Sequence, residues 1–145
     1  MKAEAYLQLK GRHEKELNEF PIAYAFDSKQ LEQALEKLGA TKEECVTVFN
    51  MGDVMKKTDV PVFKAMLKRH KEELLEAMKD KYFAEGAFLY EMNNHEYAIN
   101  WSGDEDVLAC FNMDDKKLGN MGLVSAYRRA QREHMRVARE EWGII

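Results

Sequence analysis

The sequence predicts an α+β fold: a small, mostly antiparallel sheet packed on a long central helix, with a long C-terminal helix. Two observations predict these helices. Residues 58–78 and 123–142 repeat apolar side chains at steps of three and four, which is the spacing of an amphipathic helix. A third observation predicts the sheet. Short runs of β-branched and aromatic residues lie between glycines and helix-capping residues, as is typical of strands.

The composition is that of a folded globular protein. The chain has 145 residues, of which 46% are apolar and 33% charged, and we expect a single domain over 1–145. Its formal net charge of −4 argues against nucleic-acid binding by the whole surface. The two cysteines, Cys45 and Cys110, are too few for a disulfide framework, so we expect two reduced, buried thiols. The charged N-terminus has no apolar core of a signal peptide, and no run of about eighteen apolar residues occurs, which predicts a cytoplasmic protein with no membrane contact.

The chain begins with a predicted helix, a strand and a second helix. The charged, moderately amphipathic N-terminal segment 1–19 favours a helix, and the aromatic run 22–26 favours a strand. Asp27 and Gln30 have the spacing of a capping box, in which each side chain binds a backbone N–H near the helix start. The helix that follows ends at Gly39, because glycine adopts the left-handed conformation that closes helices.

A hairpin and the central helix come next. Thr41 and Glu44 form a second predicted capping box over a single turn. The run 45–50 is the clearest strand, and 54–57 is its predicted hairpin partner across a tight turn. Thr58 is placed as the N-cap of the central helix, because its hydroxyl can accept a bond from a backbone N–H of the first turn.

The last third of the chain is predicted to be mostly helical. A helix over 82–92 leads to a short strand over 97–101, which is rich in aromatic and β-branched residues. A short helix over 104–111 and a turn segment over 112–122 follow. The chain then ends in the long helix 123–142, so that 102–145 form a helical extension beyond the core 20–101.

An arginine stripe on the C-terminal helix is the strongest functional feature. Guanidinium groups bind phosphate or carboxylate with two parallel hydrogen bonds, so an acidic partner can dock on such a stripe. The alternative is a solvated helix face, stabilised by Arg–Glu pairs at i,i+4 spacing. The stripe lies in an arc beside the apolar side of the helix and consists of Arg128, Arg129, Arg132, Arg136 and Arg139.

A polar group marks the boundary between the helix 82–92 and the strand 97–101. Asn94, His95 and Glu96 place an imidazole beside a carboxylate, which suits proton transfer or metal binding. The alternative is the polar end of a helix, with His95 facing the last carbonyls. His70 lies in the apolar stripe of the central helix, where a hydrogen-bonded histidine at the edge of the core is the alternative to a ligand.

No established catalytic or cofactor motif is present. The sequence contains no Walker A, GxGxxG, GxSxG or CxxC pattern, and His95 has no second histidine at the HExxH spacing. We therefore predict no catalytic residues, no metal and no cofactor.

Three segments within roughly 20–101 carry a resemblance to a known group of proteins: AYAFDSKQLEQALEKLGA, FKAMLKRHKEELLEAM and FLYEMNNHEYAI. The most specific marks are Tyr24-Ala25-Phe26, Arg69-His70 and Asn94-His95-Glu96-Tyr97. These segments resemble a family of small uncharacterised proteins that are carried by phages and mobile elements of gut bacteria. The resemblance implies no reaction. It implies a setting in which small acidic phage proteins act by binding a host protein, as anti-CRISPR proteins do.

Three functional hypotheses follow. The first is a non-enzymatic module of phage or mobile-element origin that binds a host protein and inhibits a defence or nucleic-acid enzyme, such as a CRISPR effector. The second is a small metal-dependent or hydrolytic enzyme that uses His95 and Glu96. The third is a nucleic-acid-binding regulator acting through the arginine stripe, which the net charge does not favour. An apolar C-terminus with Trp142, Ile144 and Ile145 would suit a homodimer contact.

Overall fold

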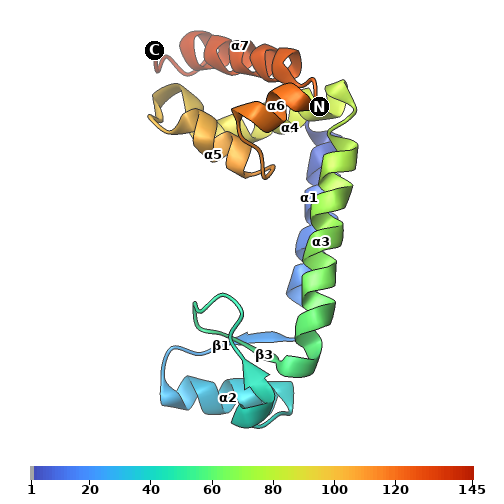
Figure 1. The fold of residues 1–145 in the computed structure, drawn as a ribbon. Coiled ribbons are helices and arrows are strands. Elements are labelled where there is room, and N and C mark those ends of the chain that lie inside the picture. The colour runs from blue at the N-terminus through green and yellow to red at the C-terminus, as the bar shows by residue number, and fades with distance from the viewer. Residues whose placement is uncertain (1) are drawn as a thin grey trace. The chain divides into compact units, whose positions relative to one another are not determined.

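The computed structural model describes residues 2–145 and confirms the α+β fold (Figure 1). That part of the chain contains seven α-helices and one three-stranded antiparallel sheet. It divides into two compact units: a sheet unit of residues 14–69, and a helical unit of the residues up to 13 together with 70–145. Helices α1 (Glu4–Glu19) and α3 (Val60–Ala77) each contribute one segment to each unit.

The sheet unit is built around its central strand. β3 (Asp53–Lys56) lies between β1 (Ile22–Tyr24) and β2 (Cys45–Val46) and is antiparallel to both. The predicted hairpin pairing is confirmed, because Cys45 is opposite Lys56 and Val46 is opposite Met55.

Both faces of the central strand are covered, because side chains alternate along a strand. On one face Val54 packs with α2 (Ser28–Leu38), in a cluster that also contains Ala23, Ala34 and Leu38. On the other face Met55 is fully buried, in a cluster with Phe63 and Met66 of α3.

The predicted local caps of the sheet unit are confirmed. The Asp27 carboxylate accepts the backbone N–H of Gln30 at 2.7 Å, and Gly39 closes α2 with a left-handed φ of 64°. Glu44 accepts the backbone N–H of Thr41 at 3.0 Å over a single 3₁₀ turn, η1 (Lys42–Glu44).

Two boundaries in the sheet unit differ from the prediction. The strand predicted over 45–50 ends at Val46, because the N–H groups that follow donate to the Asp53 carboxylate instead of to a neighbouring strand. The prediction that Thr58 caps the central helix is wrong. Thr58 lies inside a 3₁₀ turn, η2 (Lys57–Asp59), and α3 begins after it at Val60.

The helical unit has α4 (Lys81–Asn94) and α7 (Val124–Glu140) packed along each other (Figure 1). The Asp80 carboxylate caps α4 by accepting the N–H groups of Tyr82 and Phe83 at 2.9 and 3.1 Å. Aromatic rings fill the space beside these helices. Phe88 packs edge-on against both Phe111 and Tyr127, with ring centroids 5.1 Å apart in each pair.

The predicted strand over 97–101 is absent, and a 3₁₀ turn, η3 (Tyr97–Ile99), takes its place. Glu96, in the left-handed conformation with φ 52°, starts the turn. The backbone N–H of Ala98 donates to Nε2 of His134, at 3.0 Å, so it is not available to a strand ladder. A side chain 36 residues away therefore determines the local structure.

The predicted turn segment over 112–122 contains a further helix, α6 (Asp115–Asn120). Asp114 caps it by accepting the backbone N–H of Lys117 at 2.8 Å. The preceding short helix is α5 (Gly103–Ala109), and the long C-terminal helix matches its prediction closely as α7.

Gly86 lies in the middle of α4 because another segment of backbone approaches it. A Cβ atom at this position would lie 2.2 Å from the carbonyl oxygen of Lys2. Gly11, in the middle of α1, has nothing within 4 Å of the same position.

We expect opposite effects of alanine at these two glycines. Gly86→Ala lowers the free energy of unfolding by about 1–2 kcal/mol, because displacing the N-terminal backbone outweighs the gain of about 1 kcal/mol in helix propensity. Gly11→Ala raises it by about 0.5–1 kcal/mol, because only the propensity term applies. Urea unfolding of both variants measures these changes. Equal stabilisation of both would contradict the close approach at Gly86.

Candidate functional site

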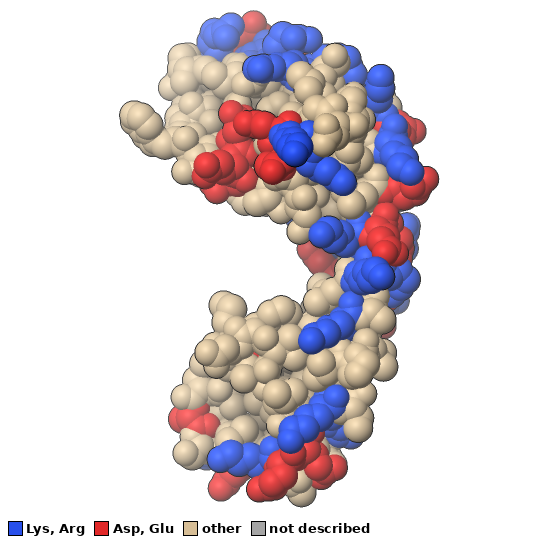
Figure 2. Space-filling view, viewed as in Figure 1, with Lys and Arg blue, Asp and Glu red and all other residues tan. Residues whose placement is uncertain are grey.

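The structure divides the arginine stripe into two groups. Arg129 is held by Glu85, with Nε 2.9 Å from the carboxylate, and Arg136 pairs with Glu133 at 2.8 Å and Glu140 at 2.9 Å. Among the residues that the structure describes, no carboxylate forms an ion pair with the other three arginines, Arg128, Arg132 and Arg139. Figure 2 shows Lys and Arg side chains gathered along α7. Two of the five arginines therefore stabilise the helical unit, and three remain available to an acidic partner.

Glu85 explains why Arg129 is structural. Glu85 is a buried residue, and its two carboxylate oxygens accept from Lys2 at 2.6 Å and from Arg129 at 2.9 Å. Burial raises the pKa of Glu85, but the hydrogen bonds from these two cations outweigh burial and keep the pKa below its usual value. Removing Arg129 would leave a buried carboxylate with one cation instead of two.

The predicted polar group at 94–96 is separated by the structure. Asn94 and His95 end α4, whereas Glu96 is exposed and begins η3. His95 lies beside Cys110, with Nε2 3.3 Å from Sγ. Its carboxylate neighbour is Glu91, one helical turn earlier, and the donor atoms of Glu91, His95 and Cys110 all lie within 4.8 Å of one another. The structure therefore groups His95 with Glu91 and Cys110, and not with Glu96.

Glu91 is the most buried member of this group, at 2% exposure. Its Oε2 accepts from the Tyr6 hydroxyl at 2.6 Å and from Lys10 Nζ at 3.2 Å, and its Oε1 accepts from Asn94 Nδ2 at 3.3 Å. Burial raises the pKa of Glu91, but these hydrogen bonds outweigh burial and lower it. Glu91 is therefore ionised at neutral pH.

The two cysteines are free thiols and are half-buried, where the sequence predicted buried ones. Burial, together with the nearby Glu91 carboxylate, raises the pKa of Cys110 to about 11. Cys110 is therefore a neutral thiol at physiological pH, which makes it a poor nucleophile.

His70 lies apart from this group, in a packed position. It is buried, and its ring stacks on that of His13 with centroids 3.9 Å apart and planes 12° apart. His13 in turn lies 3.4 Å from a Glu73 carboxylate oxygen. His70 and His95 therefore have different neighbours.

His134 is a buried polar residue of α7. It is fully buried, with Nδ1 2.6 Å from the Asn93 side-chain oxygen and Nε2 accepting the N–H of Ala98. Because Nε2 accepts, the proton of the neutral ring is on Nδ1. Burial lowers the pKa of His134, so this bonding pattern persists at neutral pH.

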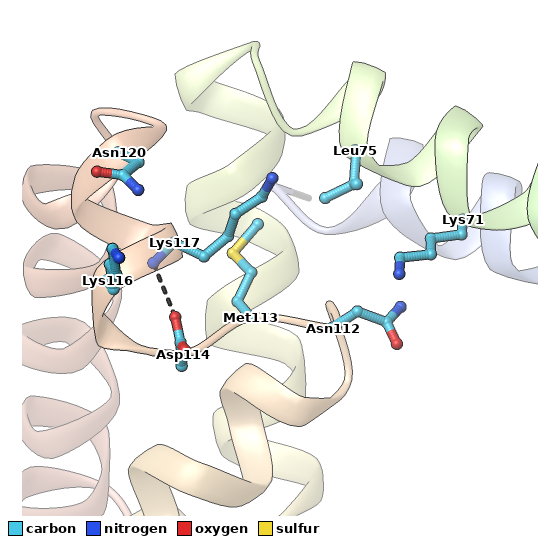
Figure 3. Close-up of a pocket in the computed structure, with 8 residues that line it drawn as sticks. All are labelled: Lys71, Leu75, Asn112, Met113, Asp114, Lys116, Lys117 and Asn120. Atoms are coloured by element: carbon cyan, nitrogen blue, oxygen red, sulfur yellow. Dashed lines mark hydrogen bonds between the residues drawn. The ribbon is translucent and has the colours of Figure 1, made fainter.

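The helical unit has a pocket of about 500 Å³ bordered by lysines (Figure 3). Lys71 comes from α3, whereas Lys116 and Lys117 come from α6. Figure 3 shows these side chains reaching the pocket from different elements, with Asp114 engaged as the cap of α6. The surroundings favour an anion, but nothing in the lining supplies an acid–base pair.

The sheet unit carries an exposed apolar surface at the end of its sheet, beside the loop that joins β2 to β3. We call it the loop surface. Its four members are large side chains with high exposed fractions: Tyr24 at 60%, Phe26 at 77%, Phe49 at 50% and Met51 at 73%. The charged side chains in Figure 2 lie away from this loop in that view.

The loop beneath this surface is held by one carboxylate. Asp53 is buried and accepts the Thr47 hydroxyl at 2.9 Å and the backbone N–H groups of Val48, Phe49 and Met51 at 2.7, 3.1 and 3.2 Å. Burial raises the pKa of Asp53, but these hydrogen bonds outweigh it and lower the pKa to about 2. The ionised Asp53 carboxylate therefore stabilises this conformation of the loop.

Phe26 is seated against the same loop. Gly52 has a φ of 82°, and a Cβ there would lie 2.5 Å from the Phe26 ring. The backbone N–H of Ala25 donates to the Gly52 carbonyl at 2.8 Å. Phe49 packs edge-on against Phe63 with ring centroids 5.8 Å apart. The exposed ring of Phe26 therefore packs against Gly52, and that of Phe49 packs against the buried Phe63.

One family model matches the chain. The Family of unknown function (DUF7659) matches residues 5–134. The chain belongs to this family. The match includes all of α1 except Glu4 and most of α7, with Arg128, Arg129 and Arg132, and ends before Arg136 and Arg139.

Other comparisons leave the activity open. No curated protein and no solved structure matches the chain. In residues 2–145, no helix combines the length and the apolar composition needed to cross a membrane.

We expect Asp53→Asn to free the loop. The amide presents an NH₂ group to backbone donors, which costs about 2 kcal/mol, because hydrogen bonds to a charged group contribute about 1.5–3 kcal/mol. The amide N–H groups of Val48 and Phe49 then exchange with solvent about 30-fold faster. Residue-resolved hydrogen exchange measures this change.

Acid has the same effect on the unmodified protein. Because the folded pKa of Asp53 is about 2, below the usual 3.8, the loop's stabilisation is complete above pH 3.8 and is lost as the pH falls toward 2.

The matched control for the Asp53→Asn variant is Asp27→Asn, because asparagine caps helices as well as aspartate does. Unchanged exchange in Asp53→Asn would show that the carboxylate does not hold the loop.

Proposed function

We propose that the protein is a non-enzymatic protein-binding module and that the loop surface is where it binds its partner. The observation that carries the proposal is the exposure of Phe49 and Met51 on the loop held by Asp53, with Tyr24 and Phe26 also exposed at the end of β1. Aromatic and methionine side chains are enriched at protein interfaces, whereas a monomeric surface rarely gathers them in one patch.

Preorganisation supports the same conclusion. Association costs free energy for every loop and side chain that must be ordered, so a loop fixed before binding loses less. The hydrogen bonds to Asp53 and the packing of Phe49 on Phe63 fix this loop in the free protein. Its exposed rings can therefore act as anchors that enter pockets of a partner.

The charged groups favour a partner with an acidic region. Arg128, Arg132 and Arg139 form no ion pairs with described carboxylates and present guanidinium groups suited to bidentate contacts. They belong to the helical unit, so they form a second contact surface, separate from the loop surface.

The biological setting is the finer part of the proposal. The resemblance to phage and mobile-element proteins supports a host protein as the partner, and inhibition of a defence or nucleic-acid enzyme, such as a CRISPR effector, as the outcome. The net charge of −4 is consistent with an inhibitor that competes with nucleic acid for a basic groove. On this proposal the protein acts in the bacterial cytoplasm.

The test is quantitative capture from bacterial lysate with the intact tagged protein. We expect the double variant Phe26→Lys, Met51→Lys to lose at least about 30-fold in affinity for the captured protein, the equivalent of about 2 kcal/mol for interface anchors. Isotope-labelled mass spectrometry, followed by titration with the purified partner, measures the loss.

The matched control is Val62→Lys. Val62 is also exposed, at 60%, and belongs to the sheet unit without contributing to the loop surface. Capture that survives the loop variant and disappears with Arg128→Ala, Arg132→Ala and Arg139→Ala combined would move the binding site to α7. Concentration-dependent dimerisation that the loop variant abolishes would identify the partner as a second copy of the chain.

A further inference from the structure

We infer that Glu91, His95 and Cys110 form a binding site for a divalent metal ion of the zinc type, with the fourth coordination position open. The inference concerns the helical unit and is independent of protein binding by the loop surface. It also departs from the sequence, which predicts no metal.

Helix geometry brings the first two ligands together. Glu91 and His95 are four residues apart, so their side chains lie one above the other on the same face of α4. Cys110 is the C-cap residue of α5 and approaches this face from a different helix. Ligands from two elements are thus placed by packing before any ion arrives.

The distances fit tetrahedral coordination. Zinc bonds of about 2.3 Å to sulfur and about 2.0–2.1 Å to nitrogen place the two ligand atoms about 3.6 Å apart in a tetrahedron. In the structure Cys110 Sγ and His95 Nε2 are 3.3 Å apart, and all three donor groups lie within 4.8 Å of one another.

The donor set selects the class of metal. One thiolate, one imidazole and one carboxylate match the borderline-soft ligands that zinc prefers, whereas magnesium and calcium take oxygen ligands. Three protein ligands with one open position are the arrangement of zinc sites that bind a water molecule. On binding, a metal–sulfur bond replaces the S–H bond of Cys110, and the proton passes to solvent.

The carboxylate is already oriented. The Tyr6 hydroxyl and Lys10 both bind Oε2 of Glu91, whereas Oε1 accepts from the Asn94 amide, at 3.3 Å. Oε1 therefore keeps a lone pair for the metal. Such outer hydrogen bonds orient metal ligands in established sites.

Cobalt(II) titration of the untagged, reduced, full-length protein tests the inference. We expect one ion per chain and the ultraviolet absorption of thiolate-to-cobalt charge transfer, displaced by an equivalent of zinc. Cys110→Ser abolishes this absorption, whereas Cys45→Ser, the matched control at the only other cysteine, leaves it intact. A protein without the absorption, or one whose absorption depends on Cys45, overturns the site.

The remaining ligands are tested by affinity. His95→Ala weakens cobalt binding by more than about 100-fold, whereas Tyr6→Phe, which removes only a hydrogen bond to Glu91, weakens it by about 10-fold. Equal affinities for His95→Ala and the unmodified protein would remove His95 from the site.

A measurement on the unmodified protein tests the site without depending on whether the variants fold. Zinc should slow alkylation of Cys110 at least about 10-fold while leaving Cys45 unchanged, because a coordinated thiolate is not available to the reagent. Peptide mass spectrometry reads both cysteines in one sample. Equal alkylation rates with and without zinc would overturn the proposal.

Discussion

Burial of an ionised carboxylate is the constraint on which both units depend. A carboxylate removed from water is stable only where hydrogen bonds or cations replace its hydration. Asp53 meets this requirement in the sheet unit with a hydroxyl and successive backbone N–H groups, and Glu91 meets it in the helical unit with Tyr6, Lys10 and Asn94. Each carboxylate thereby fixes the segments that donate to it: the loop between β2 and β3, and the start of α1 against α4.

The two sets of hydrogen-bond donors, around Asp53 and around Glu91, have different consequences for the protein surface. Around Asp53 the donors are mainly backbone groups, so the side chains of Phe49 and Met51 take no part in these hydrogen bonds and are exposed. Around Glu91 the donors are side chains: Tyr6 and Lys10 donate to one carboxylate oxygen and Asn94 donates to the other, and the imidazole of His95 and the thiol of Cys110 lie close to the carboxylate. The first arrangement favours contact with a protein, and the second favours coordination of an ion.

Sequence reasoning succeeded where the deciding contacts are local. The Asp27–Gln30 and Thr41–Glu44 caps join residues three apart, and the amphipathic spacing of α7 is visible within the helix itself. It failed in some places where distant groups decide, and in others where a nearby side chain competes with the predicted pattern, as Asp53 does for the N–H groups after Val46. The N–H of Ala98 is taken by His134, 36 residues away, and converts a predicted strand into a 3₁₀ turn. Glu91 was not singled out, because its partner Tyr6 lies 85 residues away and Cys110 joins it only through packing of α4 and α5.

The arginine stripe shows why a sequence pattern needs contacts before it becomes a binding surface. All five arginines share one arc of α7, yet Arg129 neutralises the buried Glu85, and Arg136 is held by neighbouring glutamates. A guanidinium held in this way must break existing hydrogen bonds before it can bind a partner. Breaking them offsets most of the binding free energy that the new contact would contribute. No ion pair with a described carboxylate has to be broken before a partner binds Arg128, Arg132 or Arg139. Replacing all five together would therefore mix loss of folding with loss of binding, whereas replacing these three separates the two effects.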